Sequence, residues 1–246
     1  MKAMILCAGL GTRLRPWTLE HPKALVPVGG VPMLQRVSKS LFSQGFNHIT
    51  VNVHHFASQI CDYIHAGNLP QSEVFISDES DSLLDTGGGL LHASEYLACD
   101  DAPFLVHNVD ILSNADLRLL YEEHLASGRD ITLLVSDRVS DRKLVFDRDM
   151  KLKGWINNKT SQVRPACLTI LDGDITFAFS GIYVMSPAVF DKMKVNGFSG
   201  AFAIMDFLLA GIPDVSIGGI CQNGLEIIDI GKPDTLKKAN LEISAD

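Results

Sequence analysis

The sequence predicts an α/β fold, with a mostly parallel sheet flanked by helices and a small antiparallel subsheet in the second half. One pattern in the first half supports this class. Short β-branched, apolar segments alternate with segments whose apolar residues recur at helical spacing. Repeated strand–helix units imply parallel strands with helices on both faces. In the second half, a hairpin-like segment and one long strand predict the antiparallel part.

In the first half, strands are predicted at residues 2–6, 48–53, 73–77 and 103–106, and helices at residues 32–42, 57–64 and 89–97. The first predicted helix illustrates the reasoning. Its apolar residues Leu34, Val37 and Leu41 fall on one helical face, and Gly45 follows as a stop signal. The strand at residues 48–53 is predicted from its β-branched residues.

The second half mixes antiparallel and helical signals. Helices are predicted at residues 116–125, 203–209 and 235–243, strands at 131–135, 176–185 and 225–230, and a hairpin at 143–155 with its turn at 147–149. Residues 157–174 are polar and irregular. No linker or internal repeat separates the halves, so we expect one domain, residues 1–246, whose halves 1–110 and 111–246 share a sheet.

Composition narrows the possible functions. The 246 residues carry a net charge of −8, which argues against a broad nucleic-acid-binding surface. No stretch is long and apolar enough to span a bilayer, and no signal peptide is recognisable. The five cysteines are scattered without a CxxC pair, so neither a cysteine metal site nor a disulfide framework is expected. We therefore expect a cytoplasmic protein with reduced thiols.

A glycine-rich turn follows the first predicted strand. Without Cβ atoms, Gly9 and Gly11 let the backbone curve tightly and bring its N–H groups close to a ligand, and such a row of donors suits a triphosphate. Arg13 can add a bidentate phosphate contact and Lys23 a point charge. The turn lacks the Gly-Lys-Ser/Thr ending of a Walker motif and the third glycine of a dinucleotide fingerprint, which argues against a nicotinamide-dependent oxidoreductase. Taken alone, it could also be a plain turn with solvated arginines.

Two aspartates have the character of metal ligands. Asp110 follows a short buried strand, where ligands bind in open α/β sheets, and Asp229 lies within a β-rich apolar run. Mg²⁺ prefers carboxylate and phosphate oxygens, so the pair predicts a magnesium site. Each aspartate alone could instead cap a turn or the next helix.

Residues 9–18 (GLGTRLRPWT) and 22–28 (PKALVPV) together resemble the signature of the sugar-1-phosphate nucleotidyltransferases. This resemblance implies a Rossmann-like fold of the nucleotide-diphospho-sugar transferase type, with a nucleotide-binding first half and a sugar-binding second half. It implies that Arg13, Lys23 and Asp110 act in catalysis and that Asp110 and Asp229 hold Mg²⁺. The nucleotide would contact Ala8, Gly9, Gly11, Thr12, Arg13, Lys23 and Asn108, with Gly87 and Gly88 reading the base through main-chain groups.

The residues expected to bind the acceptor sugar are marked less clearly in the sequence. By resemblance, Ser180 and Gly181 in the long strand border the sugar, and Lys159 binds its phosphate, although Lys159 stands in Asn-Lys-Thr where many relatives have Glu-Lys-Pro. A solvated loop lysine is the alternative for Lys159. Many relatives also have glycine before the first aspartate, where this chain has Val109, whose Cβ is expected to crowd the ribose or sugar side of the pocket.

The resemblance implies transfer of a nucleotidyl group to a sugar-1-phosphate with release of pyrophosphate. The segments at residues 84–89 and 176–182 look most like the branch that uses UTP and N-acetylmuramate-1-phosphate, which implies a role in cell-wall precursor synthesis. GTP with mannose-1-phosphate, and dTTP or UTP with glucose-1-phosphate, stay open. A non-catalytic nucleotide-sugar sensor or regulatory subunit is the alternative of another class. The expected partners are the two substrates, without nucleic acid or membrane, in a monomer or homo-oligomer.

Overall fold

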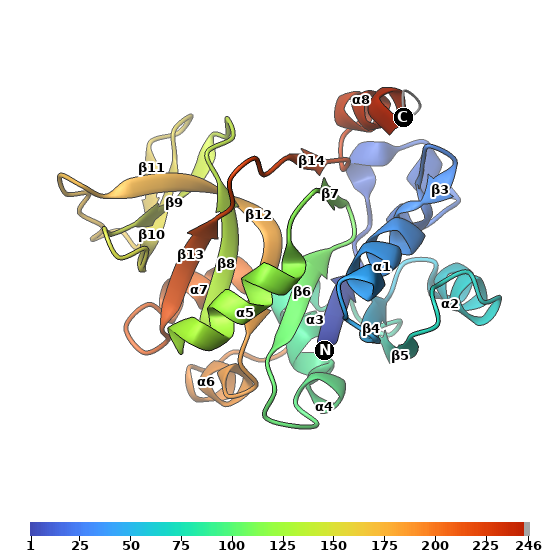
Figure 1. Ribbon diagram of the computed structural model, residues 1–246, viewed down its shortest axis with the longest axis horizontal. Coiled ribbons are helices and arrows are strands. Elements are labelled where there is room, and N and C mark those ends of the chain that lie inside the picture. The colour runs from blue at the N-terminus through green and yellow to red at the C-terminus, as the bar shows by residue number, and fades with distance from the viewer. Residues whose placement is uncertain (244–246) are drawn as a thin grey trace.

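The computed structural model describes residues 1–243 and has a ten-stranded sheet at its centre (Figure 1). Its strands are β1 (Lys2–Leu6), β4 (His48–Val53), β5 (Glu73–Asp78), β6 (Phe104–Asn108), β8 (Ile131–Ser136), β9 (Arg142–Phe146), β10 (Leu152–Asn157), β11 (Gln162–Arg164), β12 (Ile175–Met185) and β13 (Ile217–Cys221). Two small ribbons pair β2 (Pro27–Val28) with β3 (Val31–Pro32), and β7 (Ile111–Ser113) with β14 (Ile227–Asp229).

The main path of the sheet runs β11-β10-β9-β12-β6-β1-β4-β5, and β8 joins it between β12 and β13. Strands β6, β1, β4 and β5 are parallel, as are β8 and β13, whereas β12 runs antiparallel to β6, β8 and β9. In β1, Ala3, Met4 and Ile5 are fully buried, as expected for a parallel strand covered on both faces. The predicted fold class is confirmed, and the two halves share the sheet through the β6–β12 pair.

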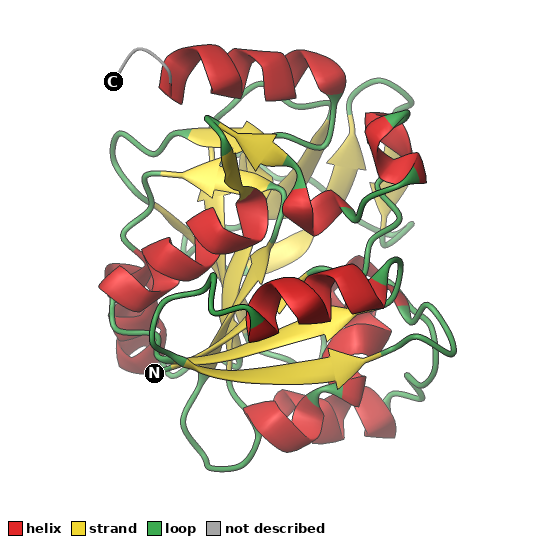
Figure 2. Ribbon diagram, turned by 90° about the vertical axis from the view of Figure 1, so that its right-hand side faces the viewer, coloured by secondary structure: helices red, strands yellow, loops and turns green. Residues whose placement is uncertain are grey.

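Helices cover both faces of the sheet (Figure 2). They are α1 (Met33–Ser43), α2 (Ala57–His65), α3 (Asp85–His92), α4 (Ser94–Leu97), α5 (Leu117–Ser127), α6 (Val189–Val195), α7 (Ile204–Ala210) and α8 (Pro233–Ile243). One core packs α1 and α5 against the sheet and includes Leu34 and Leu120, and the other packs α6 and α7 and includes Phe190 and Phe207. No helix within residues 1–243 is long and apolar enough to cross a membrane.

The helix predicted at residues 89–97 is wrong in its start and its continuity. Two helices, α3 and α4, occupy this region, and the three glycines lie inside α3 rather than in a loop before it. A Cβ at Gly88 would come 2.1 Å from the carbonyl oxygen of Gly200, so this helix packs more closely than side chains allow. Tertiary packing has overridden the low helix propensity of glycine. The prediction also missed the short elements α6, β7, β11 and β13.

His124 of α5 makes the stability of the fold depend on pH. Its side chain is buried, with Nδ1 2.9 Å from Thr132 Oγ1 and Nε2 3.1 Å from Ser186 Oγ. Burial lowers the pKa of His124 from 6.5 to about 4. Below pH 6.5 the unfolded chain therefore takes up a proton that the folded chain refuses, so this group's contribution to stability is lost as the pH falls from 6.5 towards 4.

We expect His124 to lower the free energy of unfolding by about 2 kcal/mol between pH 7 and pH 5. Urea unfolding of the unaltered protein and of His124→Gln at both pH values measures this. The decrease should be smaller in the variant by about that amount, whatever the substitution costs at pH 7. An identical pH dependence in both proteins would contradict the assignment.

Candidate active site

A cleft of about 460 Å³ opens at the carboxyl ends of β1 and β6. Its walls come from the loop after β1, from the end of β6, from Leu83 and the first turn of α3, and from Gly231 just past β14. The structure brings Asp110, the predicted catalytic residue and metal ligand, to this cleft. It also brings most of the predicted nucleotide-site residues there: Ala8, Gly9, Gly11, Thr12, Arg13, Lys23 and Asn108. Carboxyl ends of neighbouring parallel strands are the usual binding edge of such a sheet.

The loop after β1 has free main-chain donors. Within residues 1–243, the N–H groups of Gly9, Leu10 and Gly11 donate to no other group of the protein. Gly11 has a φ of +62°, and a Cβ there would lie 2.8 Å from Thr18 Cγ2 and 2.9 Å from Lys23 Cβ, so only glycine fits. Its carbonyl accepts hydrogen bonds from Leu14 N and Thr18 Oγ1, which fixes the loop. A rigid loop with unpaired N–H groups can bind phosphate oxygens.

Lys23 and Asp110 form an ion pair on one side of the cleft, with side chains that are only 14% and 11% exposed. Lys23 begins a single 3₁₀ turn, Lys23–Leu25, directly after Pro22. Taking two such charges out of water is expensive, and their mutual attraction offsets only part of that cost. The pair is therefore better explained by binding of a charged ligand that contacts both side chains than by a contribution to the stability of the fold.

Asp229 joins Asp110 from the far end of the chain. A Cβ at Gly231 would lie 2.8 Å from Asp229 Oδ1, 2.9 Å from Asp110 Oδ2 and 2.8 Å from Arg13 Nη2. The two carboxylates and the guanidinium thus face the same small space, which a side chain at position 231 would fill. Ile230 N donates to the carbonyl of Asp110 at 2.9 Å and holds the two segments together.

Asp110 and Asp229 are the side chains that could hold a divalent cation here. Their oxygens are the hard ligands that Mg²⁺ prefers, and both face the space beside Gly231. Residues 1–243 contain no group of three or more His, Cys, Asp or Glu side chains suited to a metal. The donor set therefore fits a magnesium ion that completes its shell with water and substrate phosphates, and that site stays a prediction.

Gly87 and Gly88 lie behind the cleft wall. Their N–H groups donate to the carbonyl of Phe202, at 2.9 and 3.2 Å, and both residues are buried. The same segment presents Leu83, Asp85 and Thr86 to the cleft instead, which sequence reasoning missed. Their position next to a run of glycines was the feature of the sequence that could have indicated their place in the cleft wall. Recognition of the nucleobase by main-chain groups of Gly87 and Gly88 stays a prediction. In this structure their N–H groups already donate to Phe202.

Asn52 was also missed. It is a buried polar residue near the carboxyl end of β4, and it lines the cleft. Its Oδ1 accepts from Cys7 N at 2.7 Å, and its Nδ2 donates to Glu79 Oε1 at 2.7 Å. These hydrogen bonds hold the main chain of Cys7, at the start of the loop after β1, in place. A polar residue in an otherwise apolar predicted strand was the signal in the sequence.

The predicted acceptor residues are not gathered in this cleft. Ser180 is buried, and its hydroxyl donates to the carbonyl of Leu134 at 2.6 Å, so it supports the irregular part of β12. Gly181 has a φ of +82°, and its missing Cβ makes room for the Asn108 side chain at the cleft edge. Lys159 is exposed in the turn after β10, and its side chain contacts no charged group of residues 1–243.

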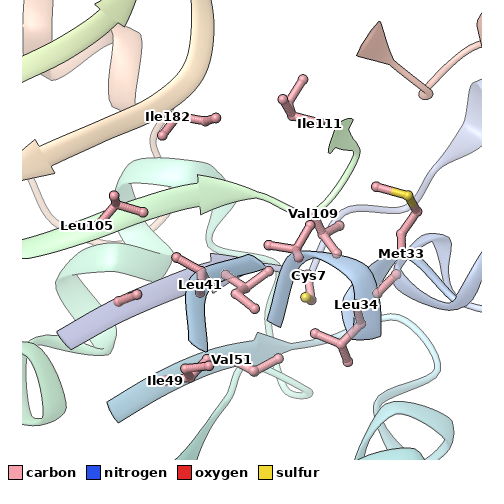
Figure 3. Packing of buried hydrophobic residues seen from close by; sticks show 14 of the residues in the cluster. Cys7, Met33, Leu34, Leu41, Ile49, Val51, Leu105, Val109, Ile111 and Ile182 are labelled. Carbon is pink, nitrogen blue, oxygen red and sulfur yellow. The ribbon is translucent and has the colours of Figure 1, made fainter. Parts of the chain in front are cut away.

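Val109 does not crowd the cleft, so that expectation was wrong. Its side chain is 3% exposed and lies in the hydrophobic core with Cys7, Leu34 and Ile111 (Figure 3). In the turn that follows β6, the Asp110 side chain faces the cleft while the Val109 side chain faces the core. The departure from glycine at this position therefore leaves the cleft open.

Comparisons with known proteins bear on the family. The family described as "Nucleotidyl transferase" matches residues 2–144. A UTP–glucose-1-phosphate uridylyltransferase of Synechocystis sp. is 32% identical over 205 residues, which cover 78% of this chain and 50% of that protein. An N-acetylmuramate alpha-1-phosphate uridylyltransferase of Caulobacter vibrioides is 40% identical over 112 residues, which cover 44% of this chain and 45% of that protein.

The chain thus spans about half the length of the curated relatives it matches. The crystal structure of HddC from Yersinia pseudotuberculosis shares the fold with a TM-score of 0.78 at 25% identity, over 98% of this chain and 99% of that one. The match at residues 2–144 takes in more than half of the chain, together with the glycine loop, Lys23 and Asp110. The chain therefore belongs to the nucleotidyl transferase family and is similar to its sugar-1-phosphate nucleotidyltransferases.

Proposed function

We propose that this protein transfers a nucleotidyl group from a nucleoside triphosphate to a sugar-1-phosphate and releases pyrophosphate. One observation carries the proposal: Arg13, Asp110 and Asp229 face a single space beside a loop with unpaired N–H groups, and Lys23 pairs with Asp110 there. Such an arrangement of fixed charges and donors suits the polyanionic substrates of phosphoryl-type transfer. Membership of the family supports the same reaction class.

In the proposed reaction, a phosphate oxygen of the sugar attacks the α-phosphorus of the nucleotide. The new oxygen–phosphorus bond forms as the bond to the β-phosphate oxygen breaks, and pyrophosphate leaves. Lys23, Arg13 and the loop N–H groups would align the phosphates and offset their charge. Asp110 and Asp229 would hold Mg²⁺, which supplies further neutralisation of phosphate charge.

This chemistry needs no protein base, because the attacking oxygen is already anionic. The histidine nearest to Asp110 in sequence fits that expectation. His107 is buried, and burial lowers its pKa from 6.5 to about 4. Its Nδ1 lies 2.8 Å from the carbonyl oxygen of Asn108. His107 is therefore a neutral residue of the core at pH 7.

Replacing Lys23 with Ala should raise the barrier of the transfer step by about 2–4 kcal/mol, because a lost transition-state donor typically costs that much. The turnover number, measured by pyrophosphate release, should fall by about 30- to 1,000-fold. Lys39→Ala is the matched control, since Lys39 is exposed on α1 and its side chain forms no hydrogen bond or ion pair with residues 1–243. Turnover within threefold of the unaltered protein would remove Lys23 from the mechanism.

For the substrates, we propose UTP with N-acetylmuramate-1-phosphate. The similarity to two uridylyltransferases, one of them specific for N-acetylmuramate-1-phosphate by name, supports this pair. A panel that combines UTP, GTP and dTTP with N-acetylmuramate-, mannose- and glucose-1-phosphate, read by pyrophosphate release, tests it. A higher kcat/KM for another pair would replace the assignment. Binding of a nucleotide-sugar with no pyrophosphate formed by any pair would favour a sensor.

A further inference from the structure

Glu79 is a buried carboxylate that lacks a cationic partner. The residue directly follows β5, is 3% exposed, and forms no ion pair with any of residues 1–243. It does not line the cleft at the carboxyl ends of β1 and β6. An unpaired charge is costly to bury, and burial raises the pKa of Glu79 above its ordinary value. The carboxylate is therefore better explained by the groups that it positions than by a contribution to the stability of the fold.

The Glu79 carboxylate is connected to two walls of the cleft. Its Oε1 accepts from Asn52 Nδ2 at 2.7 Å, and Asn52 Oδ1 accepts in turn from Cys7 N, where the loop after β1 begins. Its Oε2 accepts from Leu84 N at the longer distance of 3.4 Å. Leu84 comes directly before Asp85, which lines the cleft in the first turn of α3. One side chain behind the cleft thus contacts the supports of both walls.

The carboxylate also decides which way the Asn52 amide faces. Carboxylate oxygens only accept hydrogen bonds, so Asn52 must present Nδ2 to Glu79 and therefore Oδ1 to Cys7 N. Without that acceptor the amide is free to turn over, and its Nδ2 would then face the N–H of Cys7, donor against donor. Because Asn52 also lines the cleft, the same turn would change the polarity of the cleft wall.

The hydrogen bond between Asn52 and Glu79 is enclosed by its surroundings. A Cβ at Gly89 of α3 would lie 2.5 Å from Glu79 Oε1 and 2.9 Å from Asn52 Nδ2, so glycine is needed where the helix passes over this bond. The main chain of Glu79 is held as well. Its N donates to the carbonyl of Val53 at 2.8 Å, and His54 Nδ1 lies 2.7 Å from its carbonyl oxygen. The direction of the Glu79 side chain is therefore fixed by β4 and α3.

We propose that Glu79 is a positioning residue for nucleotide binding, which acts through Asn52 to hold the loop after β1 in its phosphate-binding conformation. This inference rests on the proposed function, because it takes the triphosphate to bind the unpaired N–H groups of that loop. Glu79 itself would touch no substrate. A loop whose donors already converge binds more tightly than one that must be ordered by the ligand, since ordering subtracts from the binding free energy.

Two substitutions of similar size separate positioning from packing. Glu79→Met fills the same space with only a weak acceptor, whereas Glu79→Gln keeps an amide oxygen for Asn52 Nδ2. Isothermal titration calorimetry with UTP, GTP and dTTP in the presence of Mg²⁺ identifies the nucleotide that binds most tightly, and this nucleotide is the probe. We expect its Kd to rise at least about tenfold in Glu79→Met, as for one lost charge-assisted hydrogen bond, and to stay within about threefold in Glu79→Gln.

Steady-state kinetics distinguish positioning from a loss of folded protein. In Glu79→Met, KM for the nucleotide should rise with its Kd, whereas KM for the sugar-1-phosphate should stay within about threefold. A purely structural role would lower the folded fraction and hence the apparent turnover number, and would leave both KM values unchanged. Glu73→Met is the matched control on the same strand. Glu73 is exposed at the other end of β5, where it contacts His48 at 2.7 Å, so its replacement should alter the Kd by less than about twofold.

A second pair of variants tests whether the effect passes through Asn52. Asn52→Ala should weaken nucleotide binding, and adding Glu79→Met to it should cost no more than about a further threefold, because residues that act in series are not additive. If Glu79→Met does not fold, Gly89→Ala replaces it. Its Cβ would intrude on the bond between Asn52 and Glu79, so it should raise the Kd by a similar factor although alanine favours the helix.

An unchanged Kd in Glu79→Met, an equal loss in Glu79→Gln, or additive losses in the double variant would overturn the proposal. Failure of the proposed function is a separate result, which pyrophosphate release measures. Nucleotide binding that depends on Glu79, without turnover of any sugar, would keep the positioning role and remove the enzyme. Turnover with a Kd that does not depend on Glu79 would do the reverse, and an unaltered protein that binds none of the three nucleotides would remove both.

Discussion

Replacing Asp110 with Asn should lower the turnover number by at least about 10³-fold. Asparagine has the shape of aspartate without its charge, so it can neither pair with Lys23 nor hold a divalent cation beside Asp229. The fold should stay intact, because the contact from Asp110 to Ile230 uses the main-chain carbonyl. Pyrophosphate release gives the turnover number, and circular dichroism with thermal unfolding checks the fold.

Asp214→Asn is the matched control for this experiment. Asp214 is exposed before β13, and its carboxylate forms no hydrogen bond or ion pair with residues 1–243. Asp229→Asn should cause a loss similar to that of Asp110→Asn, and the double variant should be little worse than either, because residues that hold one ligand act as a unit. More than a tenth of the original turnover in Asp110→Asn would refute its catalytic role.

Gly88→Val should destabilise the protein by more than about 4 kcal/mol. A Cβ at position 88 would lie 2.1 Å from the carbonyl oxygen of Gly200 and 3.1 Å from Leu84 Cβ. The nearest obstacle is main chain, which cannot rotate aside as a side chain can. Urea unfolding measures the free energy, and we expect the midpoint of thermal unfolding to fall by roughly 10 °C.

Gly9→Val is the matched comparison, with stability as its only readout. A Cβ at Gly9 would meet no atom within 4 Å, so this change should alter the free energy of unfolding by less than about 1 kcal/mol. If Gly88→Val does not fold at all, Gly88→Ala should still lose about 2 kcal/mol or more. Equal stability of the two valine variants would show that α3 can move away from Gly200.

Local patterns in the sequence were enough to predict most of the fold. The apolar run of β1 and the glycines after it predict a strand and a phosphate loop without knowledge of distant contacts. The helical state of Gly87 and Gly88 could not be predicted in this way, because it depends on the approach of Gly200 and Phe202 from the second half. Glycine by itself favours loops.

The candidate site, like the fold, could be predicted only where the local sequence marks it. The glycine loop and Asp110 could be predicted because a motif marks them. Val109 was expected to crowd the cleft because its sequence position does not show which side of the chain its side chain faces. The place of Leu83, Asp85 and Thr86 in the cleft wall could not be predicted, since it depends on how α3 packs against Gly200 and Phe202 of the second half.

The β7–β14 ribbon has a consequence for the integrity of the cleft. It returns the end of the chain to the first half, and beside it Asn114 Nδ2 donates to the carbonyl of Gly224, 110 residues away in sequence. If this ribbon opened, Asp229 would move away from Asp110, whereas Arg13, Lys23 and Asp110 all belong to the first half of the chain. Affinity for a nucleotide together with a divalent cation should therefore report whether the end of the chain is docked.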